Sequence, residues 1–329
     1  MLERGAMIHL TDKVSIGPVL MAPLAGVTDR TYRGILTELG ADLTYTEMVS
    51  AKALHYKNAN TETLLRLAPN QTKIAVQLFG NDPEILAKIA ASFEDRPEIV
   101  LIDINMGCPA PKLIKNLEGA ALMKDPRLAA EIIRTVSKAV TKPVTCKFRR
   151  GFGLGDETAL DFAKRMEEAG AKMMTIHGRY RDQFYSGESD REIIRKIKDS
   201  VSVPIIGNGD IFSGADALEL FKNTGCDGIM VARGALGNPF IFQEIDAAME
   251  GRPYEKPSPE ARIDIAIRHL KGAVEDSGEY LGVREMRKHM SWYIKGMHNA
   301  SRFRDLINQA ESEEVVIQLL NELKEDQVL

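Results

Sequence analysis

The sequence predicts a (β/α)8 barrel followed by a small, all-helical C-terminal domain. Over about the first 250 residues, short apolar runs alternate with longer amphipathic stretches, a pattern typical of βαβ units and a parallel sheet. Eight such units in roughly 240 residues match the (β/α)8 TIM barrel. The strands are expected at residues 19–22, 43–46, 74–78, 100–104, 143–148, 172–176, 204–206 and 228–231.

A doubly wound open sheet is the competing architecture for this alternation. That fold would be expected to carry a glycine-rich phosphate turn, G-x-G-x-x-G, after its first strand. Here the first apolar run ends in residues 21–26, MAPLAG, which do not form that turn. The barrel is therefore the better prediction, and residues 7–17 before it are expected to form a short hairpin that plugs its bottom.

The helices between the strands carry recognisable start and stop signals. Asp82-Pro83 and Asp125-Pro126 place a proline near the first turn, and Gly170 follows an amphipathic stretch as a stop signal. The helical patterns include residues 82–93, 126–140, 157–169 and 213–223.

The chain changes character near residues 251–257, GRPYEKP. Beyond this break no strand-like run follows, and helical periodicity continues to the C-terminus, which predicts three or four helices. The expected domains are therefore a catalytic barrel over 1–250 and a helical domain over 251–329. One basic stretch stands out in the second domain. Its members are Arg284, Arg287, Lys288, Lys295, Arg302 and Arg304.

Composition excludes several classes of protein. The net charge of −4 does not itself indicate a nucleic-acid partner, although a local patch can do so. The three cysteines are widely spaced without a CxxC pair, which argues against a disulfide framework and a metal site. There is no long apolar leader and no run of the ~18 apolar residues that a membrane span needs. We expect a cytoplasmic protein with no membrane partner and no obligate protein partner.

Polar or conformationally special residues end nearly every expected strand, where barrels of this kind place their active sites. Loop ends are often polar by chance, but chance does not easily explain a lysine, a histidine, an amide and a thiol at separate strand tips. In chain order the strand ends carry Pro23, Glu47, Gln77, Asn105 with Cys108, Lys147, His177, Asn208-Gly209-Asp210 and Ala232-Arg233-Gly234.

The last two strand ends predict a phosphate site. Barrels commonly hold a phosphate after strands seven and eight. Gly209 and Gly234 would let backbone N–H groups approach the anion, and Arg233 would add a charge-assisted fork. The alternative is that both glycines merely allow tight turns.

The middle strand ends predict contacts to a planar ring. Strand alternation directs Lys147 into the barrel and Cys146 toward the helices, and a lysine in the mouth needs an anion or an electron-rich acceptor. An exposed rim lysine is the alternative, and His177 is either a ligand contact or a satisfied polar residue. Gln77 has an amide suited to a heterocycle. With the phosphate site, this arrangement suggests a flavin mononucleotide.

Cys108 lies on a stiff loop just beyond a strand, between Gly107 and Pro109. Taken alone it is either a small buried hydrophobe or an active thiol. Beside a flavin, the thiol makes sense as a proton donor. An unperturbed cysteine, with a pKa of roughly 8.5, is mostly protonated at neutral pH.

These residues lie in blocks that closely resemble the tRNA-dihydrouridine synthases. Within the basic stretch, the segment REMRKHMSWY over 284–293 resembles the bacterial B-type branch. The resemblance runs over essentially the whole chain, and its Asn-Met-Gly-Cys-Pro block is highly specific. It implies an oxidoreductase that reduces the C5–C6 double bond of selected tRNA uridines, with tightly bound FMN and with NADPH as reductant. The other blocks are 21–30 (MAPLAGVTDR), 103–109 (DINMGCP), 175–179 (TIHGR) and 208–211 (NGDI).

The resemblance also implies a role for each matching residue. Cys108 protonates C5 of the uracil after hydride from the flavin reaches C6, and Asn105 orients the base. Two positions depart from many relatives, which have Met in place of Leu24 and Gly in place of Ala232. The implied flavin contacts are Lys147, His177 and Gln77 at the ring, Pro23, Leu24 and Ala25 on its other side, and Asn208, Gly209, Asp210, Ala232 and Arg233 at the phosphate arm.

The basic stretch gains a purpose from the same resemblance. Arg284, Arg287 and Lys288 are expected to bind tRNA phosphates, near His289, His298, Trp292 and Tyr293, whose rings are suited to stacking bases. A solvated helix face is the alternative, and we expect Trp292 in the core of the small domain. The target uridine would have to be extruded into a deep mouth between the domains.

Two other functions compete with a tRNA reductase. One is a flavin barrel that acts on a small molecule, such as a free pyrimidine or an enone. The other is an RNA-binding scaffold without catalysis. The basic tail is superfluous for the first, and the full set of flavin-facing residues beside Cys108 is unexplained by the second.

Overall fold

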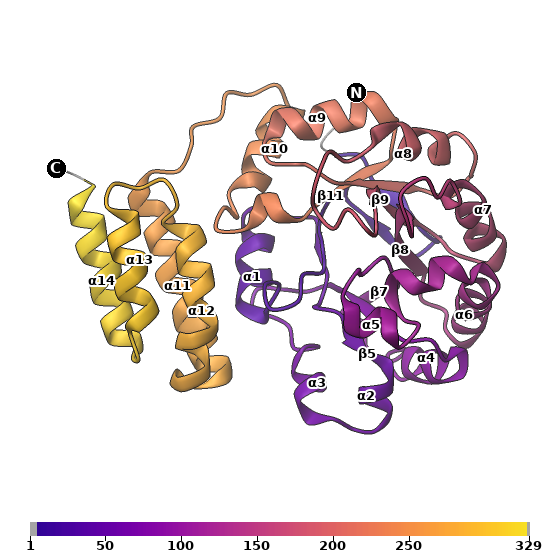
Figure 1. Ribbon diagram of the computed structural model, residues 1–329, viewed down its shortest axis with the longest axis horizontal. Coiled ribbons are helices and arrows are strands. Elements are labelled where there is room, and N and C mark those ends of the chain that lie inside the picture. Colours follow the sequence, from indigo (N-terminus) through magenta and orange to yellow (C-terminus); the bar gives the residue numbers. More distant parts are fainter. Residues whose placement is uncertain (1–4, 328–329) are drawn as a thin grey trace.

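Nine parallel strands form one continuous curled sheet in the computed structural model, which describes residues 5–327 (Figure 1). The first four residues of the expected barrel domain and the last two of the expected helical domain lie outside this range. The predicted barrel is confirmed. Its strands are β3 (Val19–Met21), β4 (Leu43–Thr44), β5 (Val49–Ser50), β6 (Ile74–Phe79), β7 (Ile99–Met106), β8 (Val144–Gly151), β9 (Met174–Tyr180), β10 (Ile205–Asn208) and β11 (Gly228–Val231).

The second expected strand, at 43–46, is divided. β4 ends at Thr44, and Tyr45 forms an isolated parallel bridge to Ala75 of β6, which joins β4 at one edge of the sheet to β6 near the other. The chain then bends, and β5 pairs with the upper part of β6, where Val49 faces Leu78. The division occurs because the segment bonds to β3 with its first half and to β6 with its second.

A short antiparallel hairpin closes the bottom of the barrel, as predicted for residues 7–17. It consists of β1 (Ile8–His9) and β2 (Ser15–Ile16). Ile8, Leu10 and Ile16 are buried in one apolar cluster with barrel residues. This cluster fills the lower barrel, so open space remains at the opposite end, where the strands finish.

Helices cover the outside of the sheet and begin where the sequence signals place them. The side chain of Asp82 accepts hydrogen bonds from the N–H groups of Glu84 and Ile85, and Gly170 ends its helix with φ of 111°. The helices of this region are α1 (Arg30–Glu38), α2 (Ala51–His55), α3 (Ala59–Thr63), α4 (Pro83–Ala91), α5 (Pro111–Lys115), α6 (Pro126–Ala139), α7 (Ala159–Ala169), α8 (Arg191–Lys198), α9 (Gly214–Thr224) and α10 (Ile241–Met249), with the 3-10 turns η1 (Gly119–Lys124) and η2 (Arg233–Ala235).

Four helices form a bundle at one side of the barrel, reached by a segment without regular structure that follows α10 (Figure 1). The bundle lies against α1 through its first helix. Among the described residues, no helix combines the length and the apolar character that a membrane crossing requires. The helices are α11 (Pro259–Ser277), α12 (Glu279–Tyr293), α13 (Ala300–Gln309) and α14 (Glu313–Asp326).

A buried polar cluster joins the bundle to the barrel. Nε2 of His269 on α11 lies 2.8 Å from the carboxylate of Asp29, which also caps α1 at the N–H of Tyr32. Nδ1 of the same ring lies 3.0 Å from the hydroxyl of Tyr293, and its face stacks on Tyr32 at 4.9 Å. Residues from α1, α11 and α12 are therefore held in one network.

Replacing Asp29 with Asn is expected to weaken the bundle–barrel contact, by about 1–2 kcal/mol once the partial solvent access of the carboxylate is allowed for. Burial raises the pKa of Asp29, but His269 and the Tyr32 N–H outweigh it and lower the pKa from 3.8 to about 2. A lowered carboxylate pKa stabilises the fold above pH 3.8, and this stabilisation disappears as the pH falls through 2. Urea unfolding should therefore show a gap between wild type and variant that closes at low pH. Asp305→Asn, at an exposed position inside α13 (Ala300–Gln309), should show no gap.

Candidate active site

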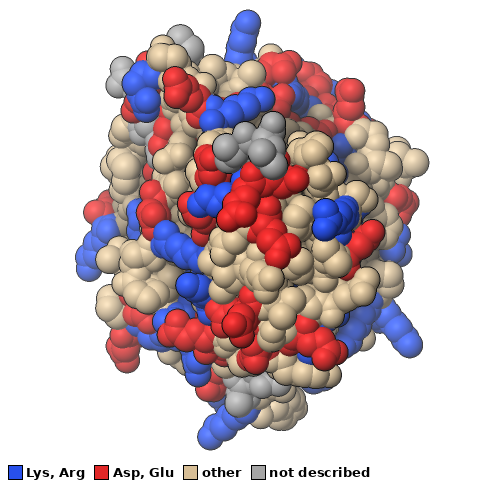
Figure 2. Space-filling view, turned by 90° about the vertical axis from the view of Figure 1, so that its left-hand side faces the viewer, with Lys and Arg blue, Asp and Glu red and all other residues tan. Residues whose placement is uncertain are grey.

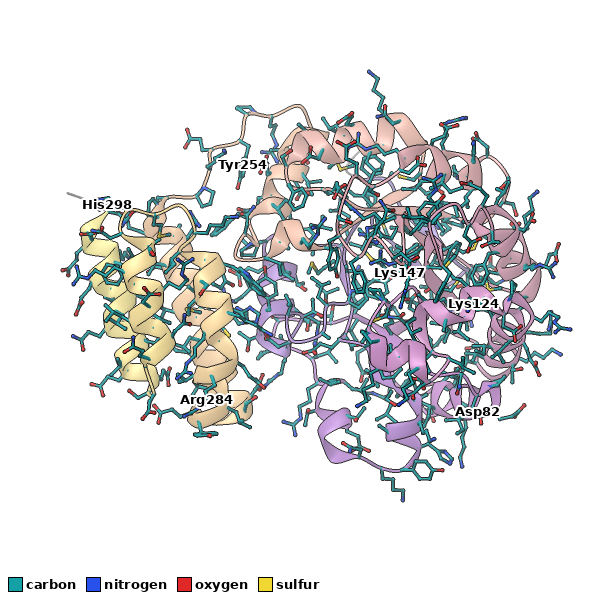
Figure 3. All side chains as sticks on the ribbon, viewed as in Figure 1. Asp82, Lys124, Lys147, Tyr254, Arg284 and His298 are labelled. Carbon is teal, nitrogen blue, oxygen red and sulfur yellow. The ribbon has the colours of Figure 1, made fainter. Side chains whose placement is uncertain are left out.

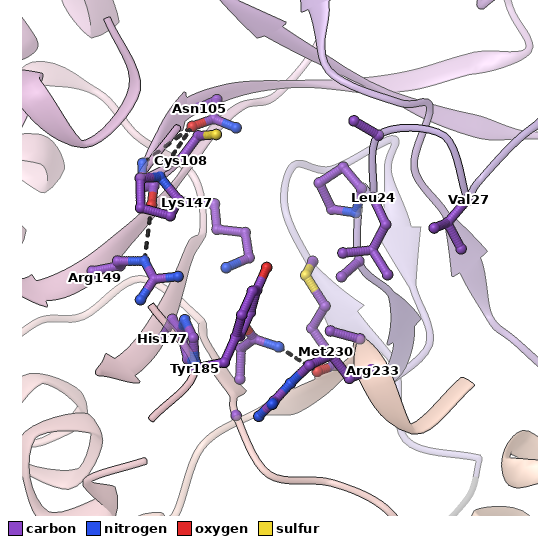
Figure 4. Close-up of a pocket in the computed structure, with 18 of the residues that line it drawn as sticks. Leu24, Val27, Asn105, Cys108, Lys147, Arg149, His177, Tyr185, Met230 and Arg233 are labelled. Carbon is purple, nitrogen blue, oxygen red and sulfur yellow. Dashed lines mark hydrogen bonds between the residues drawn. The ribbon is translucent and has the colours of Figure 1, made fainter. Parts of the chain in front are cut away.

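A cavity of about 430 Å³ opens at the C-terminal ends of the barrel strands (Figure 4). This volume falls within the ordinary range of small-molecule sites, about 300–1,000 Å³. Every residue predicted to contact the cofactor lines it, together with Asn105 and Cys108. The predicted cofactor residues are Pro23, Leu24, Ala25, Gln77, Lys147, His177, Asn208, Gly209, Asp210, Ala232 and Arg233.

Cys108 is held on a firmly anchored loop. Oδ1 of Asn105, near the end of β7, accepts hydrogen bonds from the N–H groups of Gly107 at 3.1 Å and Cys108 at 2.9 Å. The carbonyl of Cys108 accepts a hydrogen bond from Ala120 in η1. Burial raises the pKa of the Cys108 thiol. The group therefore stays protonated at neutral pH, as a proton donor must be.

Lys147 and His177 project from neighbouring strands into the same cavity (Figure 4). As predicted, Lys147 faces inward and Cys146 is fully buried in the core shared with the helices. Burial lowers the pKa of Lys147 to about 7, with a further lowering from Arg149. Burial also holds the pKa of His177 well below its usual value, helped by Lys147. His177 is therefore neutral, while Arg149 and Arg233 keep the site positive, which suits an anionic or electron-rich ligand.

At the predicted phosphate end of the cavity, Asp210 and Asn208 are already hydrogen-bonded to other protein groups. The carboxylate of Asp210 accepts two hydrogen bonds of 2.7 Å from Arg179 and one of 3.0 Å from Arg233. A carboxylate so placed would repel a phosphate, and its bond to Arg233 holds that guanidinium in place. The amide of Asn208 is likewise engaged, since it donates to the carbonyl of Met230 at 2.7 Å.

The local backbone geometry explains why glycine occupies positions 209 and 234. Gly209 has φ of 127°, a conformation that L side chains rarely adopt. A Cβ added at Gly234 would clash with the carbonyl oxygen of Ile211. Tight turns and close packing therefore account for these glycines, and the prediction of a phosphate site rests chiefly on Arg233.

Among the side chains that line the cavity, three with cationic or aromatic groups were not identified from the sequence: Arg149, Tyr185 and Phe212. Arg149 is two residues beyond Lys147 on β8, so strand alternation could have identified it; its guanidinium donates to the carbonyls of Gly107, Tyr180 and Phe184. Tyr185 and Phe212 are about half exposed and lie 4.6 and 5.4 Å from the guanidinium of Arg233. They come from loops, where no periodic signal exists.

The three basic residues predicted to bind tRNA lie on one helix, α12, but differ in their exposure and contacts. The guanidinium of Arg284 lies over the ring of Tyr280, 3.6 Å from the ring centre. Figure 3 labels Arg284 near one end of the bundle. Arg287 donates to the carbonyl of Ala310, and its Nε is buried without a partner among the described residues. Lys288 is exposed. Arg287 is therefore partly engaged within the bundle, and its contact with RNA stays a prediction.

Lys288 reaches the barrel across a cleft of about 340 Å³ between the barrel and the bundle. A Cβ added at Gly26 would lie 2.7 Å from Nζ of Lys288. The N–H of Gly26 donates to Glu47 at 2.6 Å, and its carbonyl lies 3.0 Å from Nε2 of His289. Gly26 follows the predicted flavin segment 23–25, so the bundle contacts a loop that leads into the cavity.

The aromatic residues of the basic stretch are mostly unavailable for stacking on bases. Tyr293 and His289 are buried, which is a correction to the sequence expectation. Trp292 is half-buried at the bundle–barrel contact, edge-on to His289 at 5.0 Å. His298 is exposed but lies at the end of the bundle away from the barrel (Figure 3).

The outer face of the bundle carries mixed charges. Figure 2 shows acidic side chains gathered near the centre of this face with basic ones around them. This face therefore lacks the continuous basic surface that an RNA backbone favours. In residues 5–327 no group of three or more His, Cys, Asp or Glu side chains is arranged to hold a metal ion.

Comparison of the sequence with known proteins identifies the family of the chain. The family model described as dihydrouridine synthase (Dus) matches residues 20–328. A probable tRNA-dihydrouridine synthase of Rickettsia bellii is 39% identical over 292 residues, which cover 88% of this chain and 89% of that protein. A tRNA-dihydrouridine synthase B of Vibrio parahaemolyticus is 37% identical over 304 residues, which cover 92% and 94%.

Solved structures of low identity share the fold. Histamine dehydrogenase from Rhizobium sp. 4-9 superposes with a TM-score of 0.53 at 15% identity, over 82% of this chain and 50% of that one. A variant of NCR from Zymomonas mobilis gives a TM-score of 0.52 at 14% identity, over 80% and 96%. With the family model matching nearly the whole length and a cysteine presented in a cation-lined barrel mouth, this chain belongs to the dihydrouridine synthase family.

Proposed function

We propose that this chain reduces the C5–C6 double bond of uridines in tRNA to give dihydrouridine, with FMN as tightly bound cofactor and NADPH as the reductant. The observation that carries the proposal is Cys108, a protonated thiol on an anchored loop in a cavity lined by Lys147 and His177. The family membership supplies the reaction class. We place this activity in the cytoplasm, where tRNA is found.

The cavity has the charges that a flavin mononucleotide needs. Lys147 would stabilise negative charge on the ring, and the neutral imidazole of His177 would contribute a hydrogen bond. Arg233, held by Asp210 and flanked by Tyr185 and Phe212, would bind the phosphate. Pro23, Leu24 and Ala25 provide an apolar wall. When bound, the flavin supplies the hydride that adds to C6 of the uracil.

Cys108 then supplies the proton. Its Sγ gives the proton to C5, and the thiol is restored from solvent. Because Asn105 fixes the N–H groups of residues 107 and 108, the thiol is presented at a fixed position and little reorganisation is needed at the moment of transfer. A uridine can reach this depth only when its base is extruded from the RNA stack.

Replacing Lys288 with Glu is expected to weaken tRNA binding and to reduce the salt slope of the affinity by about 1. The reason is the exposed position of Lys288 at the cleft beside the barrel mouth. Filter binding over a salt series measures the effect. Lys164→Glu on α7 makes the same charge change at an exposed position. Equal effects of the two variants would show that the RNA binds elsewhere.

The proposed function is tested by cofactor identity and product together. The purified protein should be yellow, and heat should release FMN and neither FAD nor riboflavin. Deleting the gene should remove dihydrouridine from defined tRNA positions, and the intact gene should restore it. A colourless protein that FMN does not reconstitute would overturn the cofactor proposal.

A further inference from the structure

A chain of side-chain hydrogen bonds runs from the barrel interior to the Cys108 loop. Nε2 of Gln77 donates to Oδ2 of Asp103 at 2.7 Å, and Nδ2 of Asn105 donates to Oε1 of Gln77 at 2.8 Å. Oδ1 of Asn105 then accepts the N–H groups of Gly107 and Cys108. Asp103 and Asn105 alternate on β7 and Gln77 lies on β6 opposite Asp103, so all three point into the barrel.

The direction of this chain is not set by the two amides. Glutamine and asparagine each present a donor and an acceptor and can be reversed by rotation of the side chain. An ionised carboxylate only accepts, so Asp103 forces the NH2 group of Gln77 toward itself. The Gln77 oxygen must then face Asn105, and the Asn105 oxygen must face the loop N–H groups. A reversed chain would place an NH2 group against two backbone N–H donors.

Burying the Asp103 carboxylate inside the barrel costs free energy. It is fully buried, and burial raises its pKa to about 6 even though Gln77 and Thr145 donate to it. A buried carboxylate is costly unless its hydrogen bonds are satisfied. An apolar residue would fit an ordinary barrel interior better, so a role beyond packing is indicated.

We propose that Asp103 is a positioning residue, whose acceptor-only carboxylate fixes the direction of the Gln77–Asn105 chain and thereby the place of Cys108. Its consequence for catalysis rests on the proposed function, whereas its effect on the loop does not. Asp103 is not among the residues that line the cavity, and it acts through the two amides. Without it, only the N–H groups of Gly107 and Cys108 at the other end fix the direction of the chain, so the anchor of the Cys108 loop is weakened.

Four variants of the full-length protein, as purified, test this inference by the rate at which iodoacetamide alkylates Cys108. Cys146 and Cys226 are buried, and Cys108→Ala gives the blank. Asp103→Leu removes the acceptor and should raise the rate tenfold or more, since the freed loop exposes the thiol. Asp103→Asn can accept or donate at position 103, so the direction is fixed only at the loop end and the rate should be intermediate.

The double variant Asp103→Asn with Gln77→Glu moves the acceptor-only group to position 77. The carboxylate introduced there would face the NH2 of Asn105 as the amide oxygen did before, so the rate should return to within about threefold of wild type. Thr145→Val removes the other bond to Asp103 but leaves the direction of the chain intact. It should alkylate at nearly the wild-type rate. On tRNA, Asp103→Asn should lower kcat and leave KM unchanged.

Three results would overturn the inference. They are wild-type alkylation in both single Asp103 variants, a double variant no slower than Asp103→Asn, and a Thr145→Val variant as fast as Asp103→Leu. The last would mean that packing, and not direction, is what Asp103 supplies. Should Asp103→Leu fail to fold, the comparison between Asp103→Asn and the double variant still decides. Alkylation needs no tRNA, so a wrong proposed function would appear in the turnover assay and not here.

Discussion

Replacing Cys108 with Ala is expected to lower the rate of uridine reduction by about 10²–10⁴-fold, the usual contribution of a positioned general acid. The alanine variant should still bind FMN, because the predicted flavin contacts lie on other strands. Burial raises the pKa of the thiol, so the wild-type group is protonated over the neutral range and the rate should fall only at alkaline pH. Rapid mixing of the reduced protein with tRNA, followed by flavin absorbance, measures the rate.

Two further cysteine variants give the controls for this prediction. Cys226→Ala removes a buried thiol outside the cavity and should leave the rate within about twofold of wild type. Cys108→Ser keeps a hydrogen-bonding group of similar size but supplies a much weaker acid, so it should behave like Cys108→Ala. Wild-type turnover in Cys108→Ala would remove this thiol as the proton donor.

Replacing Arg233 with Met is expected to weaken FMN binding by roughly 10–100-fold. A hydrogen bond to a charged group contributes about 1.5–3 kcal/mol, and 1.4 kcal/mol is a factor of ten in affinity. Arg233 is fixed before the ligand arrives, by Asp210 at 3.0 Å and by the rings of Tyr185 and Phe212. Little side-chain entropy is then lost on binding. Fluorescence titration of the flavin-free protein measures the affinity.

Arg191→Met on α8 is the matched control for Arg233→Met. Arg191 also forms one ion pair, with Glu219 at 2.8 Å, but it lies outside the cavity. Its FMN affinity should equal that of wild type. An unchanged FMN affinity in Arg233→Met would mean that the phosphate binds elsewhere. Riboflavin would then compete with FMN equally well in wild type and in Arg233→Met.

Much of the barrel was predictable because parallel strands buried on both faces appear as apolar runs. Each expected run contains a strand, and Asp82, Asp125 and Gly170 mark helix ends as predicted. The division of the strand at 43–46 was not predictable. It depends on Tyr45 bridging to Ala75, a residue distant in sequence, and local pattern contains no information on such pairing.

The composition of the site was predictable because strand ends converge, but the use of each side chain was not. Gln77, Asn105 and Asp210 line the cavity as expected, yet each forms hydrogen bonds to protein groups. Asp103 went unnoticed inside an apolar run, where its partner Gln77 lies on another strand. In the basic stretch, periodicity predicted a helix but not which face packs. Arg287 therefore turned out to contact Ala310 within the bundle.

The most direct test of the whole account is an anaerobic single turnover. The FMN-loaded protein, once reduced, should be reoxidised by an unmodified tRNA transcript, with one dihydrouridine formed for each flavin oxidised. The same transcript already carrying dihydrouridine at the target position should cause no reoxidation, and free uridine should react far more slowly. Reoxidation by free uridine or a small enone, but not by tRNA, would contradict the account and would indicate a small-molecule reductase.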